Sequence, residues 1–230
     1  MEQTSPPNKE IFFNGKNVII TGGSSGIGEA LARQLSSLHA NVTIIDISEK
    51  IEFPTHVQQI KADVADKSSL RLHQLSKIDT LIIAAGVTSE TNDPSDEEKE
   101  MMEAVNIDGV RNTLEVFEKH LAENAQIVYI GTHNPPKEFY AQTKRQGAEI
   151  VREFSQTHPA FTVKIILSGP VRTSLFLKGK PPEVVKRIEE NVGLYEPAEF
   201  ANELVDKLVA TGEKSGLEEE TMYKDKENNL

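Results

Sequence analysis

The sequence contains no cysteine, which excludes a disulfide framework and any metal site built from thiolates. Basic residues are also in the minority, because 25 lysines and arginines stand against 36 aspartates and glutamates, giving a formal net charge of -11. An acidic chain without a basic block is a poor match for nucleic acid or for an anionic membrane surface. We therefore expect neither of these as a partner.

Long apolar runs are missing as well. The strongest runs, residues 18–20 and 81–85, are far too short to cross a bilayer. Residues 1–10 are polar and lack the apolar core of a signal peptide. We therefore expect a cytoplasmic protein. The six histidines are scattered and give no metal site, so no metal is expected either.

What the chain does contain is a regular alternation of strand and helix patterns. With 230 residues, 37% of them hydrophobic, it is long enough to bury a sizeable core. This alternation predicts one doubly wound parallel sheet of the Rossmann type, with helices on both faces. The predicted strands are 16–21, 41–46, 57–61, 80–84, 126–130 and 161–167, and the predicted helices are 26–37, 66 onward, 95–123, 137–158, 182–190 and 197–210.

The expected domain boundaries follow from the same pattern. Residues 1–13 are expected to form a polar extension and residues 14–211 the Rossmann-type domain. Residues 212–230 form a charged tail without clear periodicity, which is either mobile or adds one edge strand. The sequence shows no composition break that would mark a second domain.

A glycine turn between the first strand and the first helix is the most informative motif. In TGGSSGIG, Gly22 permits the turn, Gly26 allows close approach of a ligand, and Gly28 lets helix and strand pack closely. The free N–H groups at a helix N-terminus then attract a pyrophosphate. The same letters match the G-x-S-x-G elbow of serine hydrolases around Ser24, but that elbow follows a central strand rather than the first one.

The spacing T-G-x-x-x-G-x-G resembles that of the short-chain dehydrogenase/reductase family, and the resemblance covers residues 14–210. Asp46, at the end of the second strand, is placed to bind the adenosine ribose and to repel the extra phosphate of NADP, so NAD is expected rather than NADP. The resemblance implies cofactor binding by Thr21, Gly22, Ser24, Ser25, Gly26, Ile27, Gly28, Asp46, Asp63, Val64, Ala84, Ala85, Gly86, Tyr140, Lys144, Val171 and Thr173.

Tyr140 and Lys144 carry the spacing Y-x-x-x-K, which places both on one face of a helix. An ammonium near a phenol lowers the phenol pKa from about 10 and makes the tyrosine a better base. The resemblance implies that Tyr140 exchanges a proton with the substrate and that Lys144 also binds the nicotinamide ribose. It further implies a water relay through Asn106 and orientation of the substrate by Thr132, where the family has serine.

Together these residues predict an NAD(H)-dependent oxidoreductase that interconverts a small alcohol and a carbonyl by hydride transfer. Residues 174–194 are expected to form the substrate lid. His133 is an alternative substrate contact or a solvated loop residue. Two departures from the family keep open a catalytically weak NAD-binding sensor of the same fold: the altered region around Thr132, with its short loop before Tyr140, and Ile83 and Ala84 in place of two asparagines. Relatives imply a homodimer or homotetramer, with Val110, Leu114, Phe117, Ala148 and Val151 either at the subunit contact or packed on the sheet.

Overall fold

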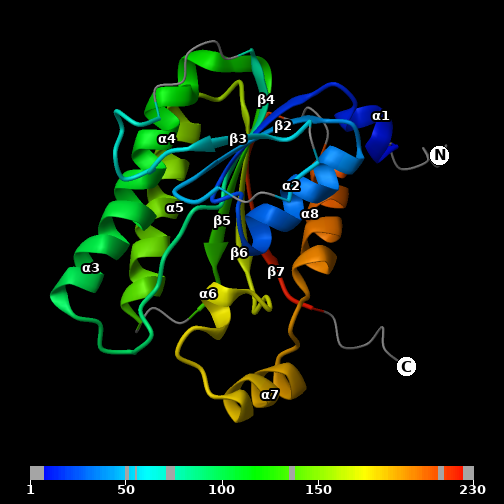
Figure 1. Ribbon diagram of the computed structural model, residues 1–230. Coiled ribbons are helices and arrows are strands. Elements are labelled where there is room, and N and C mark those ends of the chain that lie inside the picture. The colour runs from blue at the N-terminus through cyan, green and yellow to red at the C-terminus, as the bar shows by residue number, and fades with distance from the viewer. Residues whose placement is uncertain are drawn as a thin grey trace.

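The computed structural model describes residues 8–49, 52–54, 56–70, 76–134, 138–211 and 215–224. Its centre is a sheet of seven parallel strands in the order β3-β2-β1-β4-β5-β6-β7. Helices cover both faces, with α3, α4 and α5 on one side and α1, α2 and α8 on the other (Figure 1). The predicted doubly wound sheet is confirmed. The strands are β1 (Asn17–Thr21), β2 (Asn41–Asp46), β3 (Gln58–Lys61), β4 (Ile78–Ile83), β5 (Leu121–Thr132), β6 (Thr162–Ser168) and β7 (Gly216–Met222).

The helices fill the connections between these strands. Those that flank the sheet are α1 (Lys9–Phe13), α2 (Gly26–Ser37), α3 (Asp96–Glu103), α4 (Gly109–Phe117), α5 (Phe139–Thr157) and α8 (Pro197–Thr211). Two shorter elements, α6 (Ser174–Leu177) and α7 (Pro182–Asn191), lie together beyond one end of the sheet (Figure 1). They fall within residues 174–194, the segment expected to be the substrate lid.

The central strands are apolar throughout because both of their faces are covered. Neighbouring residues point into two different cores: Ile20 packs on the side of α2 and α8, whereas Ile19 packs on the side of α4 and α5. Each core is made of fully buried aliphatic and aromatic side chains. This arrangement explains why the strands lack the polar alternation of a half-exposed sheet.

The long helix expected over residues 95–123 is interrupted. Ser95 caps α3 in a reciprocal capping box with Glu98, as its sequence predicts. A π-helical turn (Ala104–Asp108) then separates α3 from α4, and a 3-10 turn (Glu118–His120) ends the segment. Leu121 already pairs with Ile78 in the sheet, so β5 begins where the helix was expected to continue.

Two other sequence expectations need correction. Residues 66–70 form turns instead of a helix, since Asp66 accepts hydrogen bonds from the backbone and hydroxyl of Ser68; residues 71–75 of that expected helix lie outside the described part. Residues 9–13, expected to belong to a polar extension over residues 1–13, form α1, and residues 1–7 lie outside the described part. Asn8 caps this helix, and Phe13 is fully buried against the core.

The charged tail adds an edge strand, one of the two alternatives drawn from the sequence. β7 pairs with the whole of β6, from Thr162 opposite Gly216 to Ser168 opposite Met222. Residues 225–230 lie outside the described part. No helix among the described residues is long and apolar enough to cross a membrane.

Candidate active site

Two adjoining cavities open at the carboxyl ends of the strands. The first cavity, of about 470 Å³, follows the glycine turn, the ends of β2 and β4, and α5. The second cavity, of about 920 Å³, lies between the loop after β4, the start of α5 and the lid. Both are lined by Thr88, Asn134, Glu138, Tyr140, Gly169, Pro170, Phe176 and Lys180. These shared residues make one continuous cleft with two compartments.

The glycine turn has no room for side chains. Gly22 has φ +71°, and a Cβ there would lie 2.6 Å from Cα of Ala85. A Cβ on Gly28 would lie 2.2 Å from the carbonyl oxygen of Gly22. Gly26 has φ +55° and faces Thr173 across the first cavity, with a Cβ position 3.0 Å from its methyl group. The N-terminus of α2 is therefore open to a ligand, which suits a phosphate group.

Two residues expected at the cofactor do not line the first cavity. Thr21 is fully buried in β1, and its hydroxyl has no partner among the described residues. The hydroxyl of Ser24 points to the carbonyl oxygen of Ser48, to which it donates a hydrogen bond of 2.7 Å. Ser24 is thus a turn residue here, which leaves the serine hydrolase alternative without support.

Asp46 is held in place by the turns on either side of it. One carboxylate oxygen accepts from the backbone N–H of Ser24 at 3.0 Å, and the other accepts from the backbone and hydroxyl of Ser48 at 3.1 Å. The side chain lines the first cavity beside Ile47. Asp63 lies further along the same wall, where its carboxylate accepts from the N–H of Ala65.

The end of β4 approaches both the glycine turn and α5. A Cβ on Gly86 would lie 3.3 Å from the side-chain oxygen of Asn106 and 3.5 Å from Nζ of Lys144. Asn106 is fully buried in the π-helical turn, outside the cavity lining. Its amide pairs with both backbone groups of Val87 and donates to the hydroxyl of Thr143. Asn106 thereby fixes the strand end that faces Lys144.

Tyr140 and Lys144 lie one turn apart on α5 and both line the first cavity. Lys144 is almost completely buried, with its ammonium 4.6 Å from the ring centre of Tyr129. Burial lowers the pKa of Lys144 to about 7. Burial, with a smaller effect of the Glu138 carboxylate, raises the pKa of Tyr140 to about 12. The sequence alone predicts a lowered pKa for Tyr140, because the spacing reveals the nearby lysine but not the loss of solvent.

Thr132 ends β5 and lines the first cavity, where its oxygen accepts from the N–H of Asn134. His133, which follows it, lines the second cavity and packs edge-to-face on Tyr223, with ring centres 5.1 Å apart. Tyr223 comes directly after β7 and also lines the second cavity. Tyr223 could not be predicted as a site residue, because the sequence of the tail carries no pattern that relates it to the site.

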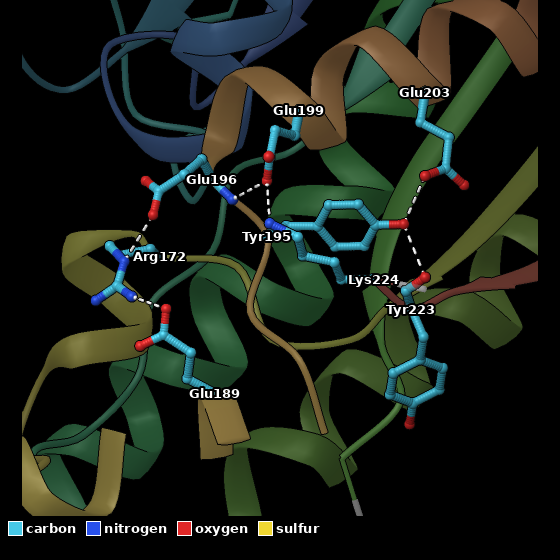
Figure 2. A network of polar contacts seen from close by, with 8 residues as sticks. All are labelled: Arg172, Glu189, Tyr195, Glu196, Glu199, Glu203, Tyr223 and Lys224. Atoms are coloured by element: carbon cyan, nitrogen blue, oxygen red, sulfur yellow. Dashed lines mark hydrogen bonds and ion pairs between the residues drawn. The ribbon is translucent and has the colours of Figure 1, made fainter. Parts of the chain in front are cut away.

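The lid is tied to the sheet at its base by a polar network (Figure 2). Arg172, which lies between the cavity-lining residues Val171 and Thr173, donates to Glu189 of α7 at 2.8 Å and to Glu196 at 2.7 Å. Its backbone N–H donates to the carbonyl of Tyr195. The lid therefore leaves and rejoins the domain at neighbouring points.

The same network reaches the end of β7. The buried hydroxyl of Tyr195 lies 2.5 Å from the carboxylate of Glu203 and 2.8 Å from the carbonyl oxygen of Tyr223. Lys224 donates to Glu199 at 2.7 Å, and Figure 2 shows these contacts joining α8 to the chain after β7. They hold the backbone that carries the Tyr223 ring into the second cavity.

Of the site residues predicted from sequence, the structure brings most to the first cavity. These are Gly22, Ser25, Gly26, Ile27, Gly28, Asp46, Asp63, Val64, Ala84, Ala85, Gly86, Thr132, Tyr140, Lys144, Val171 and Thr173. Sequence reasoning missed Glu138 and Lys180, which line both cavities. Their sequence signal is weak: Glu138 stands two residues before Tyr140 without belonging to a motif, and Lys180 lies in residues 174–194, which carry no motif.

Comparison with known proteins gives consistent matches. The family model for short chain dehydrogenases matches residues 16–180. Oxidoreductase UcpA of Salmonella typhimurium is 28% identical over 189 residues, which cover 71% of this chain and 72% of that protein. The 2,3-dihydro-2,3-dihydroxybenzoate dehydrogenase of Bacillus subtilis is 33% identical over 140 residues, covering 53% of this chain and 54% of that enzyme.

Solved structures share the fold. The ligand-free aldohexose dehydrogenase of Thermoplasma acidophilum superposes with a TM-score of 0.78 at 19% identity, over 91% of this chain and 93% of that one. A short-chain dehydrogenase/reductase of Serratia marcescens gives a TM-score of 0.77 at 22% identity, over 92% and 97%. At these identities the likeness speaks for the architecture rather than for a substrate.

Proposed function

The chain belongs to the short-chain dehydrogenase family, and we propose that it is an NAD(H)-dependent oxidoreductase that interconverts an alcohol and a carbonyl. The observation that carries the proposal is the position of Tyr140 and Lys144. They stand one helical turn apart on α5 and line the same cavity as the glycine turn. A proton donor and a buried cation are thus combined with a place for a phosphate-bearing cofactor.

The residues present fit a nicotinamide dinucleotide. The N-terminus of α2 and the crowded glycines around it suit a pyrophosphate, which needs backbone N–H groups at close range. Lys144, whose ammonium has no carboxylate partner among the described residues, suits the hydroxyls of a ribose. When bound, the cofactor would supply or accept the hydride.

The chain's own groups handle the proton and the substrate oxygen. With a pKa of about 12, the Tyr140 hydroxyl keeps its proton at neutral pH and is suited to donate it to the oxygen of a carbonyl being reduced. The Lys144 cation favours the phenolate that remains. Thr132, a hydroxyl at the end of β5, orients the substrate oxygen. Asn106 acts indirectly by holding the backbone of Val87 beside Lys144.

We propose NAD rather than NADP because of Asp46. Its carboxylate lines the first cavity and is fixed by the N–H groups of Ser24 and Ser48. A second negative charge brought next to this carboxylate is unfavourable, whereas ribose hydroxyls can donate to it. The cations that line this cavity, Lys144 and Lys180, come from α5 and the lid instead of from the glycine turn.

The first test is a titration of the purified protein with NADH and NADPH, followed by nicotinamide fluorescence. We expect NADH to bind at least about tenfold more tightly, equivalent to about 1.4 kcal/mol. Asp46→Asn should narrow this difference, since its single amide oxygen can still accept from one of the two serines but the side chain no longer repels a phosphate. Tighter binding of NADPH to the wild type would contradict the assignment.

The Tyr140→Phe variant then separates an enzyme from a sensor. The variant should bind NADH as the wild type does and lose about 10²–10⁴-fold in turnover, the usual contribution of a positioned proton donor. A variant that retains every measured activity would favour the NAD-binding sensor of the same fold.

A homodimer or homotetramer in the cytoplasm completes the proposal. The apolar residues named from sequence for a subunit contact are buried in the core beside the sheet, so any contact must use other side chains of α4 and α5. Packing of the named residues on the sheet is the second of the two alternatives drawn from the sequence. Light scattering of the purified protein tests the oligomer, and a clean monomer would remove it. The residues concerned are Val110, Leu114, Phe117, Ala148 and Val151.

A further inference from the structure

The second cavity is positively charged within an acidic protein. Among the described residues, its charged lining consists of three cations, Arg145, Lys178 and Lys180, against two carboxylates, Glu90 and Glu138. The whole chain carries a net charge of -11. A cationic cavity on an acidic surface concentrates anions locally and repels them elsewhere.

No ion pair joins these three cations to a described carboxylate, although Glu98 interacts electrostatically with Lys178 and Glu138 with Lys180. Arg145 donates to the carbonyl of Asn134 at 3.0 Å, and Lys178 donates to the carbonyl of Thr88 at 3.1 Å. The ammonium of Lys180 lies 4.8 Å from the ring centre of Phe176. By contrast, Arg172 and Lys224 near the lid base are both ion-paired. The cavity cations therefore keep charge to offer a ligand.

The fold places Lys180 at the junction of the two cavities. It lines both of them, as Tyr140 does. The backbone of Gly179 has φ +67° and touches the loop after β4, because a Cβ there would lie 1.8 Å from the carbonyl oxygen of Glu90. Together with the bond from Lys178 to Thr88, this contact holds the backbone next to Lys180 against the loop after β4.

One part of the wall of the second cavity is apolar and aromatic, and polar side chains such as Ser89 and Asn92 make up another part. The apolar and aromatic part is formed by Phe139, Phe176, Val184, Ile188, Val192 and Tyr223. Such a surface accepts a carbon skeleton, and the cations beside it favour a group of opposite charge. Burial lowers the pKa of Lys180, and the carboxylate of Glu138 offsets part of this effect.

We propose that the substrate of this enzyme is an anionic carbonyl compound or alcohol with an apolar or aromatic skeleton. Its carboxylate, or an equivalent anion, is bound by Lys180, with Lys178 and Arg145 adding to the positive field. The proposal rests on the proposed oxidoreductase function for the reacting end of the substrate. It assigns Lys180 as a specificity-determining residue.

Two near-isosteric aldehydes, 4-formylbenzoate and 4-formylbenzamide, differ in charge and test the idea directly. With NADH, we expect kcat/KM to be about tenfold higher for the benzoate, in line with a hydrogen bond to a charged group. Lys180→Gln should remove this preference and leave the value for the amide within about twofold. Lys186→Gln is the matched control, because Lys186 is an exposed lid cation that does not line the cavity.

A binding measurement keeps the test decisive when neither aldehyde is reduced. Ligand-observed NMR compares the Kd of benzoate with that of benzamide for wild type and for Lys180→Gln. Tighter binding of benzoate that disappears in Lys180→Gln supports the proposal. Equal Kd values in the wild type, or an equal loss for both compounds in the variant, overturns it.

The two proposals fail in different ways. NADH-dependent reduction of both aldehydes at equal kcat/KM leaves the oxidoreductase standing and removes the anionic substrate. Lys180-dependent binding of benzoate by a protein that binds neither NADH nor NADPH supports anion binding by Lys180 and removes the oxidoreductase. Circular dichroism and urea unfolding of the variants show that each remains folded, as expected for changes at exposed lysines.

Discussion

Lys144 is a cation that the fold keeps at a cost in stability. Its side chain is 3% exposed and no carboxylate among the described residues pairs with it. Its ammonium meets the face of the Tyr129 ring, whose hydroxyl in turn donates to the backbone of Lys144 at 2.8 Å. A buried cation with so little compensation destabilises the protein, and the lowered pKa of Lys144 is the sign of it. Such a residue is retained for what it does in the site.

Replacing Lys144 by methionine should therefore stabilise the protein while abolishing turnover. We expect the free energy of unfolding at pH 6 to rise by roughly 1–3 kcal/mol, because an uncompensated charge is removed from the interior. The folded-state pKa, about 7, lies below the ordinary value of 10.5. The penalty is therefore complete below pH 7 and declines as pH rises from there toward the unfolded value.

Urea unfolding at pH 6 and at pH 9 measures the gain in the free energy of unfolding caused by Lys144→Met. This gain should be larger at pH 6. Lys67→Met serves as the control, since Lys67 is exposed and paired with Glu115. A Lys144→Met protein that is less stable than the wild type at both pH values would mean that the ammonium is well compensated in the fold.

At the level of elements, the turn between β1 and α2 decides whether a cofactor can approach. Gly28 lies in the first turn of α2 with no positive φ, so only space requires glycine there. A Cβ would lie 2.2 Å from the carbonyl oxygen of Gly22, and this neighbour is backbone that itself touches Ala85. The helix must therefore move away from the strand to accept any side chain.

We expect Gly28→Ala to lower the free energy of unfolding by about 1–3 kcal/mol and to weaken NADH binding at least about tenfold. Gly15→Ala is the matched control: Gly15 has φ +74° but nothing within 4 Å of its Cβ position, so it tests the cost of backbone strain alone. Urea unfolding and the NADH titration measure both effects. Unchanged NADH affinity in Gly28→Ala would show that α2 does not contact the cofactor.

For the molecule as a whole, sequence predicted the architecture well because local patterns determine it. A largely apolar strand such as β4 fits only at the centre of a sheet that is covered on both faces. The glycine turn and Asp46 come at the ends of β1 and β2, and Tyr140 follows β5, so the order of strands places these motifs at one edge of the sheet. The bounds of α2 and β2 agree with the prediction to the residue.

The failures arose where distant segments decide the outcome. The π-helical turn at Asn106 is hydrogen-bonded to the backbone of Val87 after β4, and the burial of Tyr140 and Lys144 depends on packing around them. Tyr223 enters the site because the chain after β7 is held by Tyr195. None of these contacts leaves a periodic signal in the sequence, so the pKa shifts and the place of Tyr223 could not be predicted.

The lid is the part of the molecule whose position depends most on surface charges. Arg172 joins Glu189 of α7 to Glu196 at the start of α8, next to the residues that line the first cavity. Exposed ion pairs contribute little to global stability, about 0–1 kcal/mol each. These pairs nevertheless close the base of a segment with few other buried residues, so their effect should be local.

We therefore expect Arg172→Gln to speed amide hydrogen exchange in α7 while exchange in the central strands stays unchanged. KM should rise more than kcat falls, because a looser lid binds substrate less well before the chemical step is affected. Arg152→Gln is the matched control, since Arg152 also forms two ion pairs, with Glu149 and Glu219, on α5 and β7. Equal exchange rates in α7 for wild type and Arg172→Gln would mean that backbone pairing between Val171 and Tyr195 alone fixes the lid.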